Sequence, residues 1–317
     1  MTIRKKIGAL AIISVILILT FITVGIDANN YQYFLSRRVP KIAAIVLTGG
    51  CIAFSSLIFQ TITNNKILTP SILGLDSLYV AIQTFMVFVF GSTSRVMING
   101  NVNFIISVSL MIIFSTILFN KLLNREGNNI FFLLLVGLIF GTLFSSVSSF
   151  MQMIIDPNEF LIVLDKMFAS FNNVNTDILT IASISTIAIL IYTFRYKEVL
   201  DVVSLGREQA INLGIEYDKF IKKMLIIIAI LVSISTALVG PITFLGLLVT
   251  NISYQFLNTY KHKYLIVGSM LISIVFLVGG QLVVERVLNF NTTLSVIINF
   301  VGGIYFVYLL LKEVKEW

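Results

Sequence analysis

Charged residues are scarce in this sequence of 317 residues. Asp, Glu, Lys and Arg together make up 12% of it, hydrophobic residues make up 57%, and the mean hydropathy is +0.99. So little polar surface cannot cover a soluble globule, and the composition therefore indicates an integral membrane protein. Cysteine is nearly absent as well. The single Cys51 excludes an intrachain disulfide and is expected to be a small buried residue.

Catalytic motifs are also missing. His262 is the only histidine, and its place between Lys261 and Lys263 in a short loop predicts a solvated side chain. The sequence has no Ser, His, Asp set, no HExxH, no CxxC and no GxxxxGK[ST] phosphate loop. We therefore expect no enzymatic activity, no metal and no cofactor. Any uphill transport must draw its energy from another subunit or from an ion gradient.

Long apolar runs are what the sequence has instead. Each is close to the roughly 20 residues that a helix needs to cross a bilayer, and none alternates with the period of two of a membrane barrel strand. The sequence predicts an all-α, polytopic membrane bundle of about ten transmembrane helices in a single domain, residues 1–317. The first run is longer than a signal-peptide core and is expected to be an uncleaved span. The expected spans are residues 7–25, 40–62, 71–90, 102–119, 130–150, 178–194, 222–239, 242–257, 265–284 and 293–311.

The basic residues predict the orientation of these spans. With the N-terminus inside, sixteen of the 22 lysines and arginines fall on the inner side. The positive-inside rule then places both termini and residues 195–223 in the cytoplasm of a cell-membrane protein. The net charge of +7 is spread among the spans rather than gathered on one domain, which argues against a nucleic-acid partner. The six outer basic residues are Arg37, Arg38, Lys41, Arg95, Lys166 and Arg286.

Two halves of the chain resemble one another weakly. Five spans in each half, residues 1–177 and 178–317, would make the repeat inverted, as is common in transporters. Small residues at helix crossings explain the same similarity by packing alone. The matching spacings, each expected to open a span, are Gly50, Phe54, Leu57 with Gly240, Phe244, Leu247, followed by Gly74 with Gly268.

Residues 195–223, the charged segment, form the only long polar stretch. Ser204 is expected to cap a short helix that runs to Leu213, and Gly214 is expected to end it. Ala210, Ile211 and Leu213 give this helix an apolar side, which calls for a partner surface. The alternative is a solvated loop between spans.

Polar residues within the spans offer two further candidates. Four serines and Gln152 near the outer end of the fifth span either line a wet path or pack helices. Asp76 is the only acidic residue within an expected span and the only candidate there for ion binding, and a helix-end role explains it equally well. This weakens the case for an ion-coupled carrier. The serines are Ser145, Ser146, Ser148 and Ser149.

Three of the outer basic residues, Arg38, Lys41 and Arg286, define a rim. Arg38 and Lys41 flank Pro40, where the second span is expected to begin, and Arg286 follows the ninth span. They either anchor helix ends at lipid headgroups or form a charged surface for an acidic partner.

Taken together, these motifs resemble the permease family that imports iron-siderophores, haem and cobalamin by ATP-binding-cassette transport. The resemblance covers nearly the whole chain, and it is greatest for siderophore permeases of low-GC Gram-positive bacteria, with petrobactin-type catecholates as one expected cargo. The shared motifs are Arg38-Val39-Pro40-Lys41, GGCIAFSSLIFQ ending at Gln60, NKILTPSILG from Asn65 to Gly74, GREQAINLG from Gly206 to Gly214, GPITFLGL from Gly240 to Leu247, and FVGGIYFVYLLLK in the last span. The departures from the family pattern are Lys66, Thr250, Asn251, Tyr254 and Ile304, and they suggest one member of an unequal pair.

The resemblance implies a permease that forms the translocation path with a second permease subunit. It also implies a cytoplasmic ATPase dimer that receives the charged segment, and an extracellular substrate-binding lipoprotein that docks on the rim. Closure of the ATPase would then reach the fifth and sixth spans. The residues implied are Gly206, Arg207, Glu208, Gln209, Ala210, Leu213 and Gly214 for coupling, Arg38, Lys41 and Arg286 for docking, Ser145, Ser146, Ser149 and Gln152 for the path, and Asn65, Pro70, Gly74, Gly240, Pro241, Phe244 and Gly246 for structure.

Two other functions stay open at this point. The first is a secondary carrier of a polar solute driven by protons or sodium, and the second is a membrane scaffold or sensor that transports nothing. A carrier would depend on Asp76 and on an ion gradient, whereas a scaffold would depend on neither.

Overall fold

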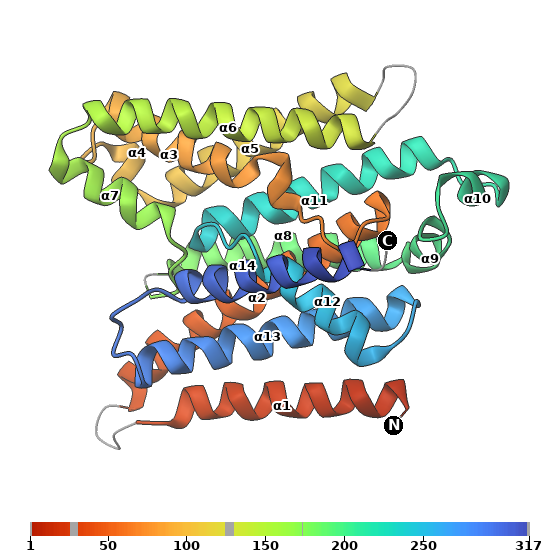
Figure 1. Ribbon diagram of the computed structural model, residues 1–317. Coiled ribbons are helices and arrows are strands. Elements are labelled where there is room, and N and C mark those ends of the chain that lie inside the picture. The colour runs from red at the N-terminus through yellow and green to blue at the C-terminus, as the bar shows by residue number, and fades with distance from the viewer. Residues whose placement is uncertain (1, 26–30, 124–129, 173, 316–317) are drawn as a thin grey trace.

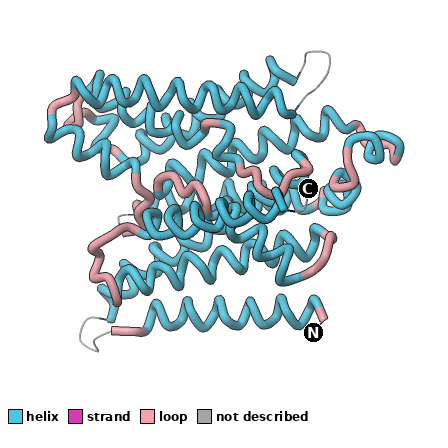
Figure 2. Tube along the Cα trace, viewed as in Figure 1, coloured by secondary structure: helices cyan, strands magenta, loops and turns pink. Residues whose placement is uncertain are grey.

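The computed structural model describes residues 2–25, 31–123, 130–172 and 174–315, and within these ranges the protein is helical with no strand (Figures 1 and 2). This confirms the all-α prediction. The elements are α1 (Ile3–Thr23), α2 (Tyr31–Thr63), the 3-10 helix η1 (Pro70–Leu73), α3 (Leu75–Phe90), α4 (Arg95–Ile98), α5 (Gly100–Leu123), α6 (Ile130–Ile154), α7 (Pro157–Met167), α8 (Thr176–Phe194), α9 (Lys197–Val203), α10 (Arg207–Asn212), α11 (Tyr217–Val239), α12 (Leu245–Leu257), α13 (His262–Arg286) and α14 (Leu294–Lys315).

Eight of the described helices are long and apolar enough to cross a membrane, and α3 and α12 are shorter apolar helices. Each of the ten expected spans coincides with one of these. The second begins earlier than expected, because α2 starts at Tyr31 and carries Pro40 within it. The connections α4, α7 and α9 are helical where the sequence predicted no helix.

Helix α2 lies at the centre of the bundle. It packs against α11 on one side and α13 on the other, while α5 packs on α11, α3 on α6, and α1 on α13, so that the helices follow one another across the view in Figure 1. In the most hydrophobic 18-residue stretch of α2, 83% of the residues are buried, compared with 11% for α1 at the edge. The core is therefore built on α2 and α11.

The two ends of the bundle carry different short helices. Both termini lie at the same end as α9 and α10, and α4 and α7 lie at the opposite end (Figure 1). We call these the knob end and the rim end. The termini and the charged segment thus share one end of the bundle, and the location of that end in the cytoplasm stays a prediction.

The predicted repeat spacing is wrong in one respect. Gly50 does not open a span but lies in the middle of α2, whereas Gly240 sits in the loop before α12 with φ +101°. The two short helices give a better correspondence, since α3 and α12 are each the third apolar helix of their half.

Candidate functional site

The charged segment folds into the knob, which we define as residues 197–213, containing α9 and α10. Gly206 precedes α10 with φ +104°, and Gly214 follows it with φ +85°, a backbone region that favours glycine. The Ile215 amide donates to the Ala210 carbonyl at 3.0 Å and the Gly214 amide to the Ile211 carbonyl at 2.9 Å, which is the Schellman arrangement that ends a helix. The predicted stop at Gly214 is confirmed.

Ser204 does not cap α10, contrary to the prediction. It ends α9 instead, and its hydroxyl donates to the Asp201 carbonyl at 2.7 Å, while Gly206 takes the position before α10. Glycine suits that position because the backbone there needs a positive φ, which disfavours serine.

The apolar residues of the knob divide between two surfaces. Ala210 is fully buried and joins the core of the bundle with Leu200 and Val203 of α9. The exposed fractions of Leu205, Ile211 and Leu213 are 59%, 47% and 63%. These three side chains therefore leave an apolar surface at a polar end of the bundle. Arg207, Glu208 and Gln209 are exposed beside them.

Polar contacts around the knob are mostly at the surface. Arg207 reaches Asp218 at 3.5 Å with both side chains about half exposed, so this pair contributes little to stability. The Lys223 ammonium hydrogen-bonds the Tyr196 hydroxyl and lowers the pKa of that phenol.

His262 is the exception, and its predicted solvation is wrong. Its side chain is buried, with 1% of the residue exposed. Asp201 Oδ1 lies 2.7 Å from His262 Nδ1, and Thr61 Oγ1 lies 2.8 Å from His262 Nε2. Neighbours in the sequence gave no sign of this, because both partners come from distant helices.

The rim residues are brought together, and each has partners within the chain. Arg38 donates to the carbonyls of Ile22 at 2.7 Å and Val24 at 2.8 Å, and Arg286 donates to Val24 at 2.6 Å. These carbonyls end α1, where cations are favourable. Lys41 pairs with Glu285 at 2.6 Å, with both side chains largely buried.

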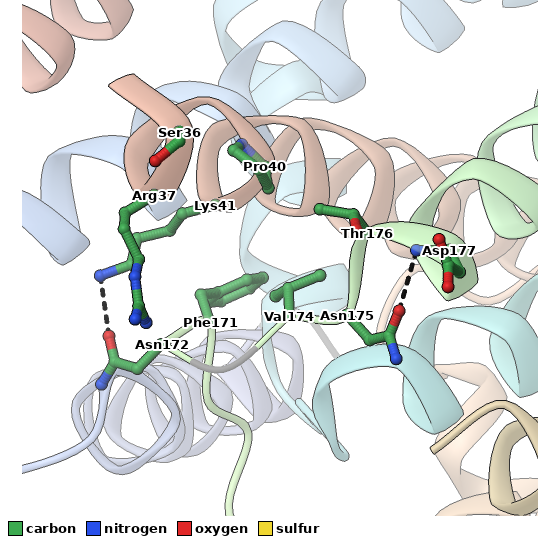
Figure 3. A pocket seen from close by; sticks show the side chains of 10 residues that line it. All are labelled: Ser36, Arg37, Pro40, Lys41, Phe171, Asn172, Val174, Asn175, Thr176 and Asp177. Carbon is green, nitrogen blue, oxygen red and sulfur yellow. Dashed lines mark hydrogen bonds between the residues drawn. The ribbon is translucent and has the colours of Figure 1, made fainter. Parts of the chain in front are cut away.

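A pocket of about 550 Å³ opens beside the rim; in Figure 3, Arg37 and Lys41 approach Asn172 on one side of it and Asp177 lies on the far side. Lys41 donates to Asn172 Oδ1 at 2.8 Å across this pocket. Arg37 is exposed and lies over the Tyr33 ring, with 5.6 Å to its centroid. Arg37 is therefore a more accessible charge than Lys41.

The predicted path residues divide along the two sides of α6. Ser145, Ser149 and Gln152 line a groove of about 210 Å³ together with Ser77 of α3. Their spacing puts them on one helix face. Ser146 is exposed but does not line this groove. The Ser146 and Ser149 hydroxyls also donate to carbonyls one turn earlier, so the packing explanation holds in part.

Asp76 lies in the first turn of α3, the helix-end position that the sequence allowed. It borders the α6 groove and a second, smaller cavity that Thr243 shares. Its Oδ2 atom is buried and has no hydrogen-bond partner among the described residues.

The predicted structural residues occupy turns and close helix contacts. Asn65 Oδ1 accepts the Ile67 amide at 2.8 Å, Pro70 begins η1, and Gly74 follows it with φ +76°. Sequence reasoning missed the pair Gly137 and Gly141 of α6, whose backbones lie against the turn at Gly74. Of the remaining structural residues, Gly240 lies beside Ala169 and Pro241 lines the α6 groove. Phe244 directly precedes α12, and Gly246 lies against Ser56.

Three departures from the family motifs lie close together. The Lys66 carbonyl accepts from Gln60 Nε2 at 2.8 Å and from Asn251 Nδ2 at 2.9 Å, and the Lys66 ammonium lies over the Tyr254 ring. Lys66, Asn251 and Tyr254 thus form one interacting set rather than three unrelated changes.

Comparisons with known proteins agree with these motifs. The model of the FecCD transport family matches residues 5–312. The chain is 67% identical over 291 residues to the petrobactin import system permease protein YclO of Bacillus subtilis, covering 92% of each chain. It is 38% identical over 290 residues to the permease protein FatC of the petrobactin import system of Bacillus anthracis, covering 92% of this chain and 82% of that protein.

A solved structure described as an inward-facing conformation of a metal-chelate type ABC transporter shares the fold. Its TM-score is 0.81 at 20% sequence identity, and the match covers 98% of this chain and 100% of the other. The predicted family is confirmed by these matches: the chain is a multi-pass membrane protein that belongs to the FecCD transport family.

Proposed function

We propose that this chain is a permease subunit of an ATP-driven importer of ferric siderophores of the petrobactin class in the plasma membrane. The names of the two relatives, both permease proteins of petrobactin import systems, support the cargo class. The observation that carries the mechanism is the knob, since it presents exposed Leu205, Ile211 and Leu213 on a base buried in the bundle. A cytoplasmic ATPase dimer is the partner that such a surface fits.

The chain would form the path together with a second, different permease. The α6 groove supports this, because Ser145 and Ser149 are exposed on a helix that is long and apolar enough to cross the membrane, where lipid offers a hydroxyl no hydrogen-bond partner. A second permease facing this groove would enclose a polar route for the chelate. The departures at Lys66, Asn251 and Tyr254 favour an unequal pair.

The five helices of each half would be related by inversion, with residues 1–177 and 178–317 as the halves and 195–223 as the coupling loop. The short third helices of both halves, α3 and α12, support this relation, since unusually short or interrupted helices at matching positions are typical of inverted repeats. The rim would dock an extracellular binding lipoprotein.

The knob assignment is tested with Arg207→Glu combined with Leu213→Asp in the complete importer reconstituted in vesicles. We expect ATP-dependent uptake of ferric petrobactin to fall at least about tenfold, because Arg207→Glu reverses the charge of the contact surface and Leu213→Asp places a carboxylate in its apolar part. Delivery of the chelate to the outer face is unchanged. The control is Lys261→Glu with Tyr260→Asp, two exposed residues at the same end outside the knob. Normal uptake by the knob variant contradicts the assignment.

A gradient-driven carrier is distinguished in the same vesicles. Uptake through an ATP-driven importer needs a nucleotide-binding subunit and continues when the proton and sodium gradients are collapsed. Asp76→Asn is expected to retain uptake. Loss of uptake in that variant together with sensitivity to ionophores would identify the carrier instead.

A further inference from the structure

One helix connects the two surfaces on which the proposed function depends. Helix α13 contains 25 residues, or about 37 Å at 1.5 Å per residue. It begins with His262, which contacts the knob, and ends with Glu285 and Arg286, which contact the rim residue Lys41 and the end of α1. A rigid helix of this length moves both ends together when either end is displaced.

At the knob end, Asp201 of α9 binds the first residue of α13 through two hydrogen bonds. Asp201 Oδ1 accepts two hydrogen bonds from a single residue, one from the His262 backbone amide at 2.6 Å and one at Nδ1 at 2.7 Å. An ionised carboxylate only accepts, so Nδ1 must carry the proton of the second bond. The backbone amide belongs to the first residue of α13, which has no side-chain cap of its own. Asp201 therefore caps α13 from a different helix.

The ring continues the connection to the centre of the bundle. His262 Nε2 lies 2.8 Å from Thr61 Oγ1 near the end of α2. Helix α9 also packs directly against α2 and α13, whereas α10 packs against α9 and α11. Displacement of α10 thus reaches α2 and α13 through α9, which also directly follows the sixth span, α8.

We propose that Asp201 and His262 are positioning residues that couple the ATPase-facing knob to the docking rim through α13. This inference rests on the proposed function. Coupling of this kind is reciprocal, so binding at the rim must also bias the knob. Loss of the bonds is expected to disconnect the two ends while leaving both surfaces intact.

The test uses the complete importer in vesicles, with Asp201→Ala, Asp201→Asn and the control Glu198→Ala, an exposed residue of the same helix. Two ratios are measured with ferric petrobactin as the probe: chelate taken up per ATP hydrolysed, and stimulation of ATP hydrolysis by the loaded binding protein. We expect Asp201→Ala to lower both at least about tenfold, because it removes both hydrogen bonds to the carboxylate and the loss of one such bond changes an equilibrium by about that factor. The ATPase is expected to stay bound. Asparagine keeps the accepting oxygen and is expected to restore both ratios to within about twofold.

A double-variant cycle separates a coupled pair from two independent defects. Asp201→Ala with His262→Ala is expected to lose no more than the single variants, because each removes the same connection. The proposal is overturned if the losses in the double variant are additive. It is also overturned if Asp201→Ala leaves both ratios unchanged or releases the ATPase subunits. If the wild type itself takes up no chelate, the proposed function is wrong. If the wild type takes up chelate and Asp201→Ala has the same two ratios, only the coupling is refuted.

Discussion

At the scale of single residues, Gly246 of α12 is the described glycine at which an added Cβ atom would come closest to a neighbouring atom, Ser56 of α2. A Cβ atom there would lie 1.9 Å from Ser56 Oγ and 2.7 Å from Ser56 Cβ. We predict that Gly246→Ala destabilises the protein by about 1–3 kcal/mol, because the two helices must separate to admit the methyl group. The measurement is the thermal-unfolding midpoint of the assembled importer in detergent.

Two further variants test the cause of this loss. Ser56→Gly removes the clashing atoms and is expected to recover most of the midpoint when combined with Gly246→Ala. Gly8→Ala in α1 is the control, since nothing described lies within 4 Å of a Cβ at that position. Equal destabilisation by both alanine substitutions would show that glycine itself, and not the contact with Ser56, sets the stability.

At the scale of elements, the rim joins three helices, because Arg38 of α2 and Arg286 of α13 both bind the last carbonyls of α1. We predict that the triple variant Arg38→Gln, Lys41→Gln and Arg286→Gln binds the lipoprotein about tenfold more weakly at low salt. Glutamine removes the charges but retains donors for the α1 carbonyls. The difference should shrink near 1 M salt, where the Debye length is about 3 Å. Titration of the lipoprotein at two salt concentrations measures it.

The matched control removes the same charge from the knob end. Glutamine at Lys5, Lys261 and Lys263, all exposed there, is expected to leave association unchanged. Equal weakening by both triple variants would indicate a general effect of net charge and reject the rim as the docking surface.

At the scale of the whole molecule, the path depends on which outer surface meets water and which meets lipid. Cys51 is the only cysteine and is fully buried, so the unmodified chain should be unreactive. We predict that Ser149→Cys, in the α6 groove, reacts with a hydrophilic thiol reagent in the assembled importer. Phe150→Cys, from a side chain 64% exposed but absent from the groove lining, is expected to react at least about tenfold more slowly, because thiolate formation requires water. Equal labelling would place the path elsewhere.

Composition and hydropathy determined the class of this protein, because only helices or a closed barrel satisfy the backbone in lipid and the apolar runs lack the alternation of barrel strands. The family followed from local motifs such as GPITFLGL, since turns and close helix contacts demand particular residues in consecutive positions. The stop of α10 at Gly214 is local in the same sense, and its prediction held. Ser204 was misplaced because α9, a helix that the sequence did not predict, ends at it and Gly206 takes the position before α10.

Only the tertiary structure decided which polar side chains meet. His262 looked solvated between two lysines, yet Asp201 and Thr61 from other helices bury it. Lys41 of the rim pairs with Glu285 of α13, a partner that nothing near it in the sequence indicates. Hydropathy fixes that a helix crosses the membrane but not its rotation or its neighbours. Those depend on packing between residues far apart in the chain, and these pairings place the surfaces through which the protein is proposed to work.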